Sequence, residues 1–321
     1  MALRPLTLAV ASLLVTACAA AGPAAREAAP QTSPPAREDP ASVEMARTGE
    51  GFDDGPIGSF SKSRAMAHVR KLAADIGVRV RATRGERRGA RYVAESFEAM
   101  GYRVNVQRFS VDGATSRNVV AYWPGSRAYG VVVGGHMDTV PGSPGANDNA
   151  SGVAVLLEVA RLVAGKEPAR SVRFVAFGSE EYGEDRRHHV GSQTYVNRLG
   201  EEGRRRLGGM ISVDMVADGR PLLVGNSGIA DDVVARTLYR KVRRAGIGVR
   251  YQVLCDCSDH GPFEHAGIPA AFAYSGQEAN YHDPSDTVAN LNPDHLLRTG
   301  KAIRAFVVAV DRAMLQKFRQ H

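Results

Sequence analysis

Residues 131–152 read VVVGGHMDTVPGSPGANDNASG, a short apolar run followed directly by charged side chains. The uninterrupted run at Val131–Gly135 is typical of a strand buried on both faces of a sheet. His136 follows the run at once, and Asp148 lies in a loop that leads into a predicted helix at Ser151–Ala164. The segment therefore predicts a buried strand, a loop that carries polar side chains and a covering helix.

Apolar runs and amphipathic segments alternate on both sides of this segment. Three further apolar runs predict buried strands, and two alternating runs predict half-polar strands. The buried runs are Val172–Phe177, Met210–Asp214 and Ala270–Tyr274, and the alternating runs are Tyr102–Phe109 and Asn118–Trp123. Helices are predicted at Ser61–Ala74, Gly89–Met100, Ile229–Ala245 and Pro293–Phe318, a surface loop at Gly183–Val190 and a polar connector at Gly200–Arg206. Strands separated by helices favour an α/β fold, in which a largely parallel or mixed sheet is covered by helices on both sides.

Histidines and carboxylates lie at or just beyond the ends of the predicted strands. They are His136, Asp138, Asp148, Glu180, Glu181, Asp214 and His282. Because sites in open α/β sheets form outside the carboxyl ends of the strands, we expect these side chains to gather at one edge.

The residue types in this set match those of a two-metal hydrolytic site. Two imidazoles and three carboxylates suit Zn²⁺, which binds His nitrogen and Asp or Glu oxygen. Of the two remaining carboxylates, Asp138 is placed to orient His136 directly or through the local backbone. Glu180, adjacent to Glu181, is placed to take a proton from a water whose pKa a metal lowers. Asp148 has a second interpretation, as the N-cap of the helix that follows it.

The composition is that of a folded, Arg-rich chain. Its 321 residues include 44% hydrophobic side chains and carry a formal net charge of +7, and one large domain or two small ones fit this length. No second domain with its own core is apparent. The cations are scattered, without an aromatic platform or a recognition helix, so we expect no nucleic-acid partner. Nothing in the sequence specifies an oligomeric state.

The N-terminus has the features of an export signal. Leu6–Val15 is an apolar run of signal-peptide length, too short to span a bilayer. Small residues lead to Cys18, as in the lipobox of bacterial lipoproteins, so we expect a lipoprotein signal peptide at residues 1–17 and a membrane-binding lipid on Cys18. The alternative is an ordinary signal peptide cut near Ala17 to Ala21, with Cys18 incidental.

The segment after Cys18 has the composition of a tether. Residues 18–60 are rich in Ala, Pro, Glu, Ser and Gly, a mixture that cannot bury enough apolar surface to order itself. We expect the folded domain at residues 61–321. In a lipoprotein, Ala rather than Asp at position 20 permits sorting to the outer membrane, so we expect an exported, outer-membrane-anchored protein that faces the periplasm or the exterior.

Cys255 and Cys257 allow three interpretations. An exported chain with a lipid on Cys18 has this one remaining pair for a disulfide, although the spacing is strained for one. The two sulfurs can instead be free thiols or metal ligands.

Six segments together resemble the M28 family of zinc peptidases. They are Gly134–Thr139, Gly145–Gly152, Gly178–Gly183, Val213–Met215, Ser258–Phe263 and Tyr281–Thr287. One such segment would be a weak signal, but six in the family's order over about 62–318 are specific. The resemblance implies a mixed, mostly parallel sheet between helices, the fold of zinc exopeptidases. Its implied activity is removal of N-terminal residues from peptide substrates.

The resemblance also implies roles for the site residues, with two zinc ions per chain. His136 and Asp214 would bind one zinc, Glu181 and His282 the other, and Asp148 would bridge them. Glu180 would be the general base and acid, with Asp138 behind His136. A carboxypeptidase and a one-zinc glutaminyl cyclase use the same scaffold and are alternatives, as is a non-catalytic receptor-like domain.

The chain departs from the family pattern after Gly183. The family reaches a Gly-Ser pair within a few residues, whereas here Glu184–Val190 intervenes before Gly191. This longer loop is a candidate lining of the substrate cleft. His188 and His189 within it are interpreted as solvated, with metal binding as the alternative. Cys257, directly before Ser258, resembles secreted aminopeptidases that carry a disulfide near the site, and Asp259 is a candidate residue of the substrate cleft.

Overall fold

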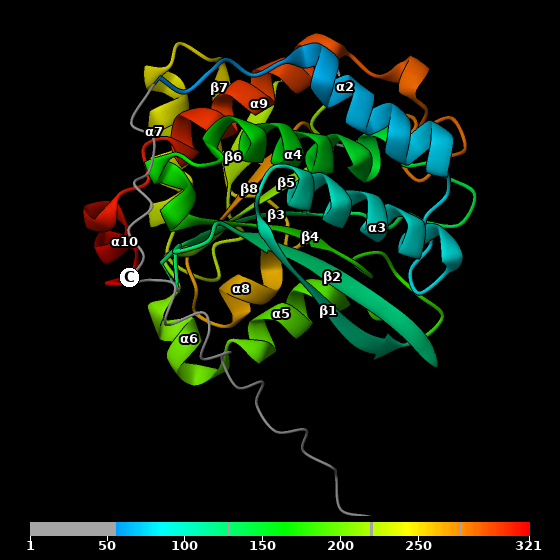
Figure 1. Cartoon of the computed structure of the whole chain (residues 1–321), viewed down its shortest axis with the longest axis horizontal. Helices are drawn as coiled ribbons and strands as arrows, with labels where there is room; N and C mark the ends of the chain where they lie inside the picture. Colours follow the sequence, from blue (N-terminus) through cyan, green and yellow to red (C-terminus); the bar gives the residue numbers. More distant parts are fainter. Residues whose placement is uncertain (1–55, 128, 219–220, 277) are drawn as a thin grey trace, which may run out of the picture. The chain divides into compact units, whose positions relative to one another are not determined.

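The computed structural model of the chain describes residues 56–127, 129–218, 221–276 and 278–321 (Figure 1). The predicted signal peptide, Cys18 and the tether up to residue 55 lie outside the described residues, so these remain predictions. Among the residues that are described, no helix combines the length and apolar character needed to cross a bilayer.

One mixed sheet forms the centre of the described part of the chain. Its strand order is β1-β2-β4-β3-β5-β8-β6-β7. The strands are β1 Arg103–Val111, β2 Ala114–Tyr122, β3 Val131–His136, β4 Val172–Phe177, β5 Gly209–Asp214, β6 Leu222–Gly225, β7 Val249–Tyr251 and β8 Ala270–Tyr274. The pairs β4–β3, β3–β5, β5–β8 and β6–β7 are parallel, and β1–β2, β2–β4 and β6–β8 are antiparallel. The prediction of an α/β fold with a mixed, mostly parallel sheet is confirmed.

Helices cover both faces of this sheet (Figure 1). On one face lie α2 Lys62–Arg70, α3 Arg84–Ala99, α4 Gly152–Val163, α7 Val233–Arg244 and α9 Pro293–Val307, and on the other α5 Val190–Arg198, α6 Gly200–Arg206 and α8 Gly261–His265. The remaining helical segments are α10 Arg312–Phe318 and the short turns η2 Lys71–Ile76, η3 Ala146–Ser151, η4 Glu167–Ser171 and η5 Val288–Asn290. Val131 and Val133 pack into the core on the α4 side, and Val132 into the core on the α5 side, because successive side chains of a strand point to opposite faces.

The close approach of η3 and α4 to the sheet depends on glycine. A Cβ on Gly135 would lie 2.6 Å from the carbonyl oxygen of Val213, and a Cβ on Gly152 would lie 2.1 Å from the same oxygen. The side chain of Asn149 fills the remaining space and donates to that oxygen at 2.9 Å. This packing brings the loop that carries Asp148 against the end of β5, which carries Asp214.

Two predicted segments differ from the structure in the type or number of their elements, while others, such as the helix predicted at Gly89–Met100, differ only in their bounds. The polar connector predicted at Gly200–Arg206 is helix α6, because acids in its first turn pair with cations in its last: Glu201 with Arg205 and Glu202 with Arg206. Such pairs and their match to the helix dipole stabilise a polar helix. Pro293–Phe318 is two helices, since Asp311 caps a new one by accepting from Met314 N at 2.7 Å.

Candidate metal centre

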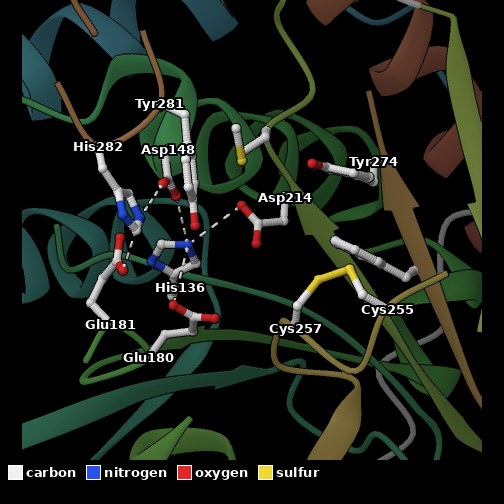
Figure 2. A pocket seen from close by; sticks show the side chains of 12 residues that line it. His136, Asp148, Glu180, Glu181, Asp214, Cys255, Cys257, Tyr274, Tyr281 and His282 are labelled. Atoms are coloured by element: carbon white, nitrogen blue, oxygen red, sulfur yellow. Dashed lines mark ion pairs between the residues drawn. A yellow bond between two sulfur atoms is a disulfide. The ribbon is translucent and has the colours of Figure 1, made fainter. Parts of the chain in front are cut away.

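The seven candidate residues converge at the carboxyl edge of β3, β4 and β5. His136 and Asp214 end their strands, and Glu180 and Glu181 follow β4 after two residues. Asp148 lies in η3, and His282 follows β8 at positive φ. Figure 2 shows the candidate ligands and Glu180 facing one cavity. The cavity has a volume of about 230 Å³.

The carboxylate of Asp148 lies between the two histidines. Its Oδ1 is 3.1 Å from His136 Nε2, and its Oδ2 is 3.2 Å from His282 Nε2. His136 Nε2 also lies 3.4 Å from Asp214 Oδ1, and His282 Nε2 lies 3.2 Å from Glu181 Oε2. The five side chains thus form two adjacent groups that share Asp148 (Figure 2).

The capping interpretation of Asp148 does not fit this geometry. Asn149 Oδ1, rather than Asp148, accepts the hydrogen bond from Gly152 N at 2.8 Å. The backbone N–H groups of Asn147 and Asp148 both donate to Asp286, at 2.7 and 3.0 Å. The carboxylate of Asp148 is thereby left to face the histidines.

Burial and the close spacing of the carboxylates shift the pKa values of the site residues. Burial alone would lower the pKa of His136, but Glu180 and Asp214 raise it well above its ordinary value. Burial and the neighbouring Asp148 raise the pKa of Glu181 to about 7. Burial also lowers the pKa of His282. Hydrogen bonds with Asp148 and Glu181 outweigh this effect and raise the pKa to about 10.

The donor set fits divalent cations. Two buried oxygens, Glu181 Oε1 and Asp214 Oδ1, have no hydrogen-bond partner among the described residues, and such oxygens are costly unless a cation or donor meets them. Nitrogen and oxygen atoms lie within 4.8 Å of one another in His136–Glu180–Asp214 and in His136–Asp148–Glu181. Imidazole nitrogens with carboxylate oxygens are ligands that zinc accepts.

Asp138 holds the turn that carries the acidic pair. Its two carboxylate oxygens accept from the backbone N–H groups of Glu180 and Glu181, each at 3.1 Å. His136 Nδ1 lies closer to the Asp138 carbonyl, at 3.2 Å, than to the carboxylate, at 3.7 Å. Asp138 therefore faces His136 mainly through its backbone, one of the two routes expected from the sequence.

Two further side chains position the ligands, and the sequence did not single them out for this. Ser258 Oγ donates to Asp214 Oδ2 at 2.8 Å. Arg79 is fully buried and donates to the backbone carbonyls of Met137 and Gly145, at 2.8 and 2.9 Å. An isolated arginine outside any motif gives no sequence signal for such a role.

Cys255 and Cys257 form a disulfide that lines the cavity. Of the three interpretations, the structure has the disulfide. Figure 2 shows it across the cavity from the histidines. Asp259, expected in the cleft, is instead fully buried and is not part of the cavity lining, so that prediction is wrong.

The prediction of a solvated His189 is also wrong. Its side chain is buried, and its Nε2 lies 3.0 Å from Glu180 Oε1. Burial lowers the pKa of His189 to about 3. His188 stacks on exposed Tyr182 with ring centroids 4.4 Å apart. The longer loop thus has a solvent-facing part and a residue that reaches the site.

Comparison with known proteins places the chain among peptidases. The sequence model of peptidase family M28 matches residues 118–307. Leupeptin-inactivating enzyme 1 of Streptomyces exfoliatus is 30% identical over 271 residues, which cover 75% of this chain and 60% of that protein. The probable lipoprotein aminopeptidase LpqL of Mycobacterium tuberculosis is 30% identical over 238 residues, which cover 62% of this chain and 45% of that protein. The chain spans about half the length of these curated relatives.

A solved structure has the same fold. The structure of BSAP, a zinc aminopeptidase from Bacillus subtilis, superposes with a TM-score of 0.72 at 20% identity, and the alignment covers 81% of this chain and 97% of that one.

Proposed function

The chain belongs to peptidase family M28, and from that premise we propose that it is a two-zinc aminopeptidase, which hydrolyses N-terminal residues from peptides. The observation that carries this proposal is the place of Asp148, whose two oxygens face His136 and His282 at 3.1 and 3.2 Å. A carboxylate between two imidazoles, each with a further carboxylate beside it, is the arrangement that a bridged pair of cations requires.

The ligands would divide between two zinc ions as the family resemblance implies. His136 and Asp214 would hold one, Glu181 and His282 would hold the other, and Asp148 would be shared. Zinc in such a site supplies a Lewis acid that makes a water more acidic and polarises the scissile carbonyl. The protein supplies a preorganised set of side chains, buried except for half-buried His282, that needs little rearrangement during the reaction.

Glu180 is the proposed general base. Its Oε2 lies 3.9 Å from His136 Nε2, beside the proposed metal ligands, and the side chain lines the cavity. It takes a proton from the attacking water and returns it to the leaving amine. Asp138 keeps Glu180 in place by accepting from its backbone N–H.

The cavity lining favours an aminopeptidase over a carboxypeptidase. A carboxypeptidase needs a cation for the carboxylate of its substrate, and no Arg or Lys of the described chain lines this cavity. Acidic groups there suit a free α-amine instead. Met215, Phe272, Tyr274 and Tyr281, with the disulfide, complete the lining and favour an apolar N-terminal side chain.

A glutaminyl cyclase and a receptor-like domain fit the geometry of the site less well. A glutaminyl cyclase uses one zinc, whereas both histidines and all three carboxylates of a two-metal site lie together here. A receptor-like domain would not need Glu180 to be held beside the proposed ligands by Asp138.

We further propose that the enzyme works outside the cytoplasm on a lipid tether at Cys18, in the outer membrane. The Cys255–Cys257 disulfide fits an oxidising compartment. One relative is named a probable lipoprotein aminopeptidase. Metabolic labelling with a fatty acid, compared between the wild type and Cys18→Ser, tests this proposal.

The enzymatic proposal is tested with purified protein on aminoacyl and N-blocked substrates, with and without a chelator. Hydrolysis of the free-amine substrate alone, lost on chelation, is expected. Glu180→Gln should lower kcat by about 10²–10⁴-fold while about two zinc ions per chain remain bound. Full activity of Glu180→Gln would refute the role of the base, and one zinc per chain would favour the cyclase.

A further inference from the structure

The loop after β4 turns back and pairs with the segment that carries the acidic residues. The backbone N–H of His189 donates to the Glu180 carbonyl at 2.7 Å, and that of Val190 donates to the Ser179 carbonyl at 2.8 Å. These two bonds fix His189 beside Glu180, although the two residues are well separated in the sequence. The loop is therefore joined to the candidate active site at its base.

The His189 ring contacts one oxygen of the Glu180 carboxylate. His189 Nε2 lies 3.0 Å from Glu180 Oε1, which is within hydrogen-bond distance. The other oxygen, Oε2, lies 3.9 Å from His136 Nε2 on the metal-ligand side. The two oxygens thus have different neighbours, and a contact with Oε1 fixes the direction in which Oε2 points.

The surroundings of His189 hold its ring in this place. The residue is 7% exposed and has a φ of 54°, a left-handed region that is uncommon outside glycine but that Asn, Asp and His enter more often than other residues. Its carbonyl accepts from Ser192 Oγ at 3.1 Å and from Gln193 N at 2.9 Å. Its Nε2 has His188 Nδ1, at 3.1 Å, as a second neighbour beside Glu180. The buried position and the fixed backbone indicate a built contact rather than a solvated side chain.

We propose that His189 is a positioning residue for Glu180. The His189 ring binds Oε1 of the Glu180 carboxylate, so that Oε2 faces the attacking water. This inference rests on the proposed function, because it assigns the orientation of the proposed base. His189 touches no substrate in this scheme. Its loss should therefore lower kcat and leave KM, set by the cavity lining and the metals, nearly unchanged.

Two substitutions separate the backbone from the ring. Asparagine accepts the positive φ of position 189 but is too short to reach Glu180, so His189→Asn removes the contact alone. Glutamine places an amide nitrogen near the position of Nε2, so His189→Gln should restore much of the lost kcat. Arg186→Asn is the matched control, since Arg186 is an exposed residue of the same loop with a φ of 57°.

The experiment measures kcat, KM and bound zinc for each variant, in the wild type and in Glu180→Gln. His189→Asn should lower kcat about 10–100-fold, the cost of a misplaced catalytic group, with KM and zinc retained. In the Glu180→Gln background, His189→Asn should lower kcat little further, because both substitutions act through the side chain at position 180. Crystal structures should show the Glu180 carboxylate turned in His189→Asn and unmoved in Arg186→Asn.

Several results would overturn the inference. Unchanged kcat in His189→Asn would do so, as would an equal loss in the Glu180→Gln background or a loss that follows zinc release. A wild-type enzyme active on aminoacyl substrates, with an equally active His189→Asn, would refute the inference and leave the proposed function standing. A zinc-loaded wild type without peptidase activity would refute both.

Discussion

Arg79 donates from Nε to the backbone carbonyl of Met137 at 2.8 Å, which ties a fully buried guanidinium to the segment between His136 and Asp138. The same side chain donates to four more carbonyls, those of Leu72, Gly77, Pro144 and Gly145. Arg79 thereby joins both ends of the loop between β3 and η3 to the segment around η2. Two proposed ligands, His136 and Asp148, thus depend on one side chain outside the family motifs.

Arg79→Met should destabilise the fold strongly. It removes five hydrogen bonds to backbone carbonyls, although the carbonyls of Leu72 and Gly145 keep a backbone donor each. We expect this loss to lower the free energy of unfolding by about 3 kcal/mol or more. Urea denaturation of the metal-free proteins measures this. Arg91→Met, on the exposed face of α3, is the control and should change stability little. Equal stability of the two variants would contradict the assigned role.

Metal content should respond differently to the loss of each ligand. His282 contacts only Asp148 and Glu181 of the proposed ligands, so His282→Asn should lower the bound zinc from about two ions to about one per chain. Asp148→Ala should weaken the binding of both zinc ions. Elemental analysis after dialysis gives the counts, and two tightly held ions in Asp148→Ala would contradict the bridging role.

The stability of the fold should fall as the pH rises, through a buried carboxyl outside the site. Burial and the nearby Asp138 raise the pKa of Glu86 from 4.5 to about 8. The folded protein therefore holds this proton more tightly than the unfolded chain. The resulting stabilisation is complete below pH 4.5 and is lost as the pH rises towards about 8. Between about pH 5 and 9, the melting temperature of Glu86→Gln should fall less steeply with pH than that of the wild type. Parallel curves of melting temperature against pH would rule out a contribution from Glu86.

The sequence predicted those parts of the fold whose cause is local. Val172–Phe177 and Ala270–Tyr274 were predicted at the bounds that the structure has, because a continuous apolar run suits a strand buried on both faces. The four residues of β6 and three of β7 are too short for any periodicity. They exist because neighbouring strands offer hydrogen bonds.

The candidate site likewise has residues that a local pattern predicts and residues whose role depends on the folded chain. The seven candidate residues were found because each stands at or near a strand end or in a motif. His189 was misjudged because its burial depends on a backbone pairing with Glu180 that only the folded loop makes. Arg79 was missed because its partners are carbonyls, which every residue has. Motifs therefore revealed the candidate ligands together with Glu180 and Asp138, but not Arg79 and His189, whose contacts form only in the folded chain.

The disulfide should affect substrate binding more than stability. Cys255 and Cys257 line the cavity beside Phe272 and Tyr274, while their bond closes a loop with a sequence separation of 2. Closing so short a loop removes little entropy from the unfolded chain, so the double variant Cys255→Ser/Cys257→Ser should lose about 1–2 kcal/mol at most. The wall of the cavity, however, becomes free to move. We expect KM for apolar aminoacyl substrates to rise by a larger factor than kcat falls, with bound zinc unchanged. Treating the wild type with a reductant that does not bind metal should reproduce this effect, and the double variant should not respond to it. A fall in kcat at constant KM would instead connect the disulfide to the catalytic groups.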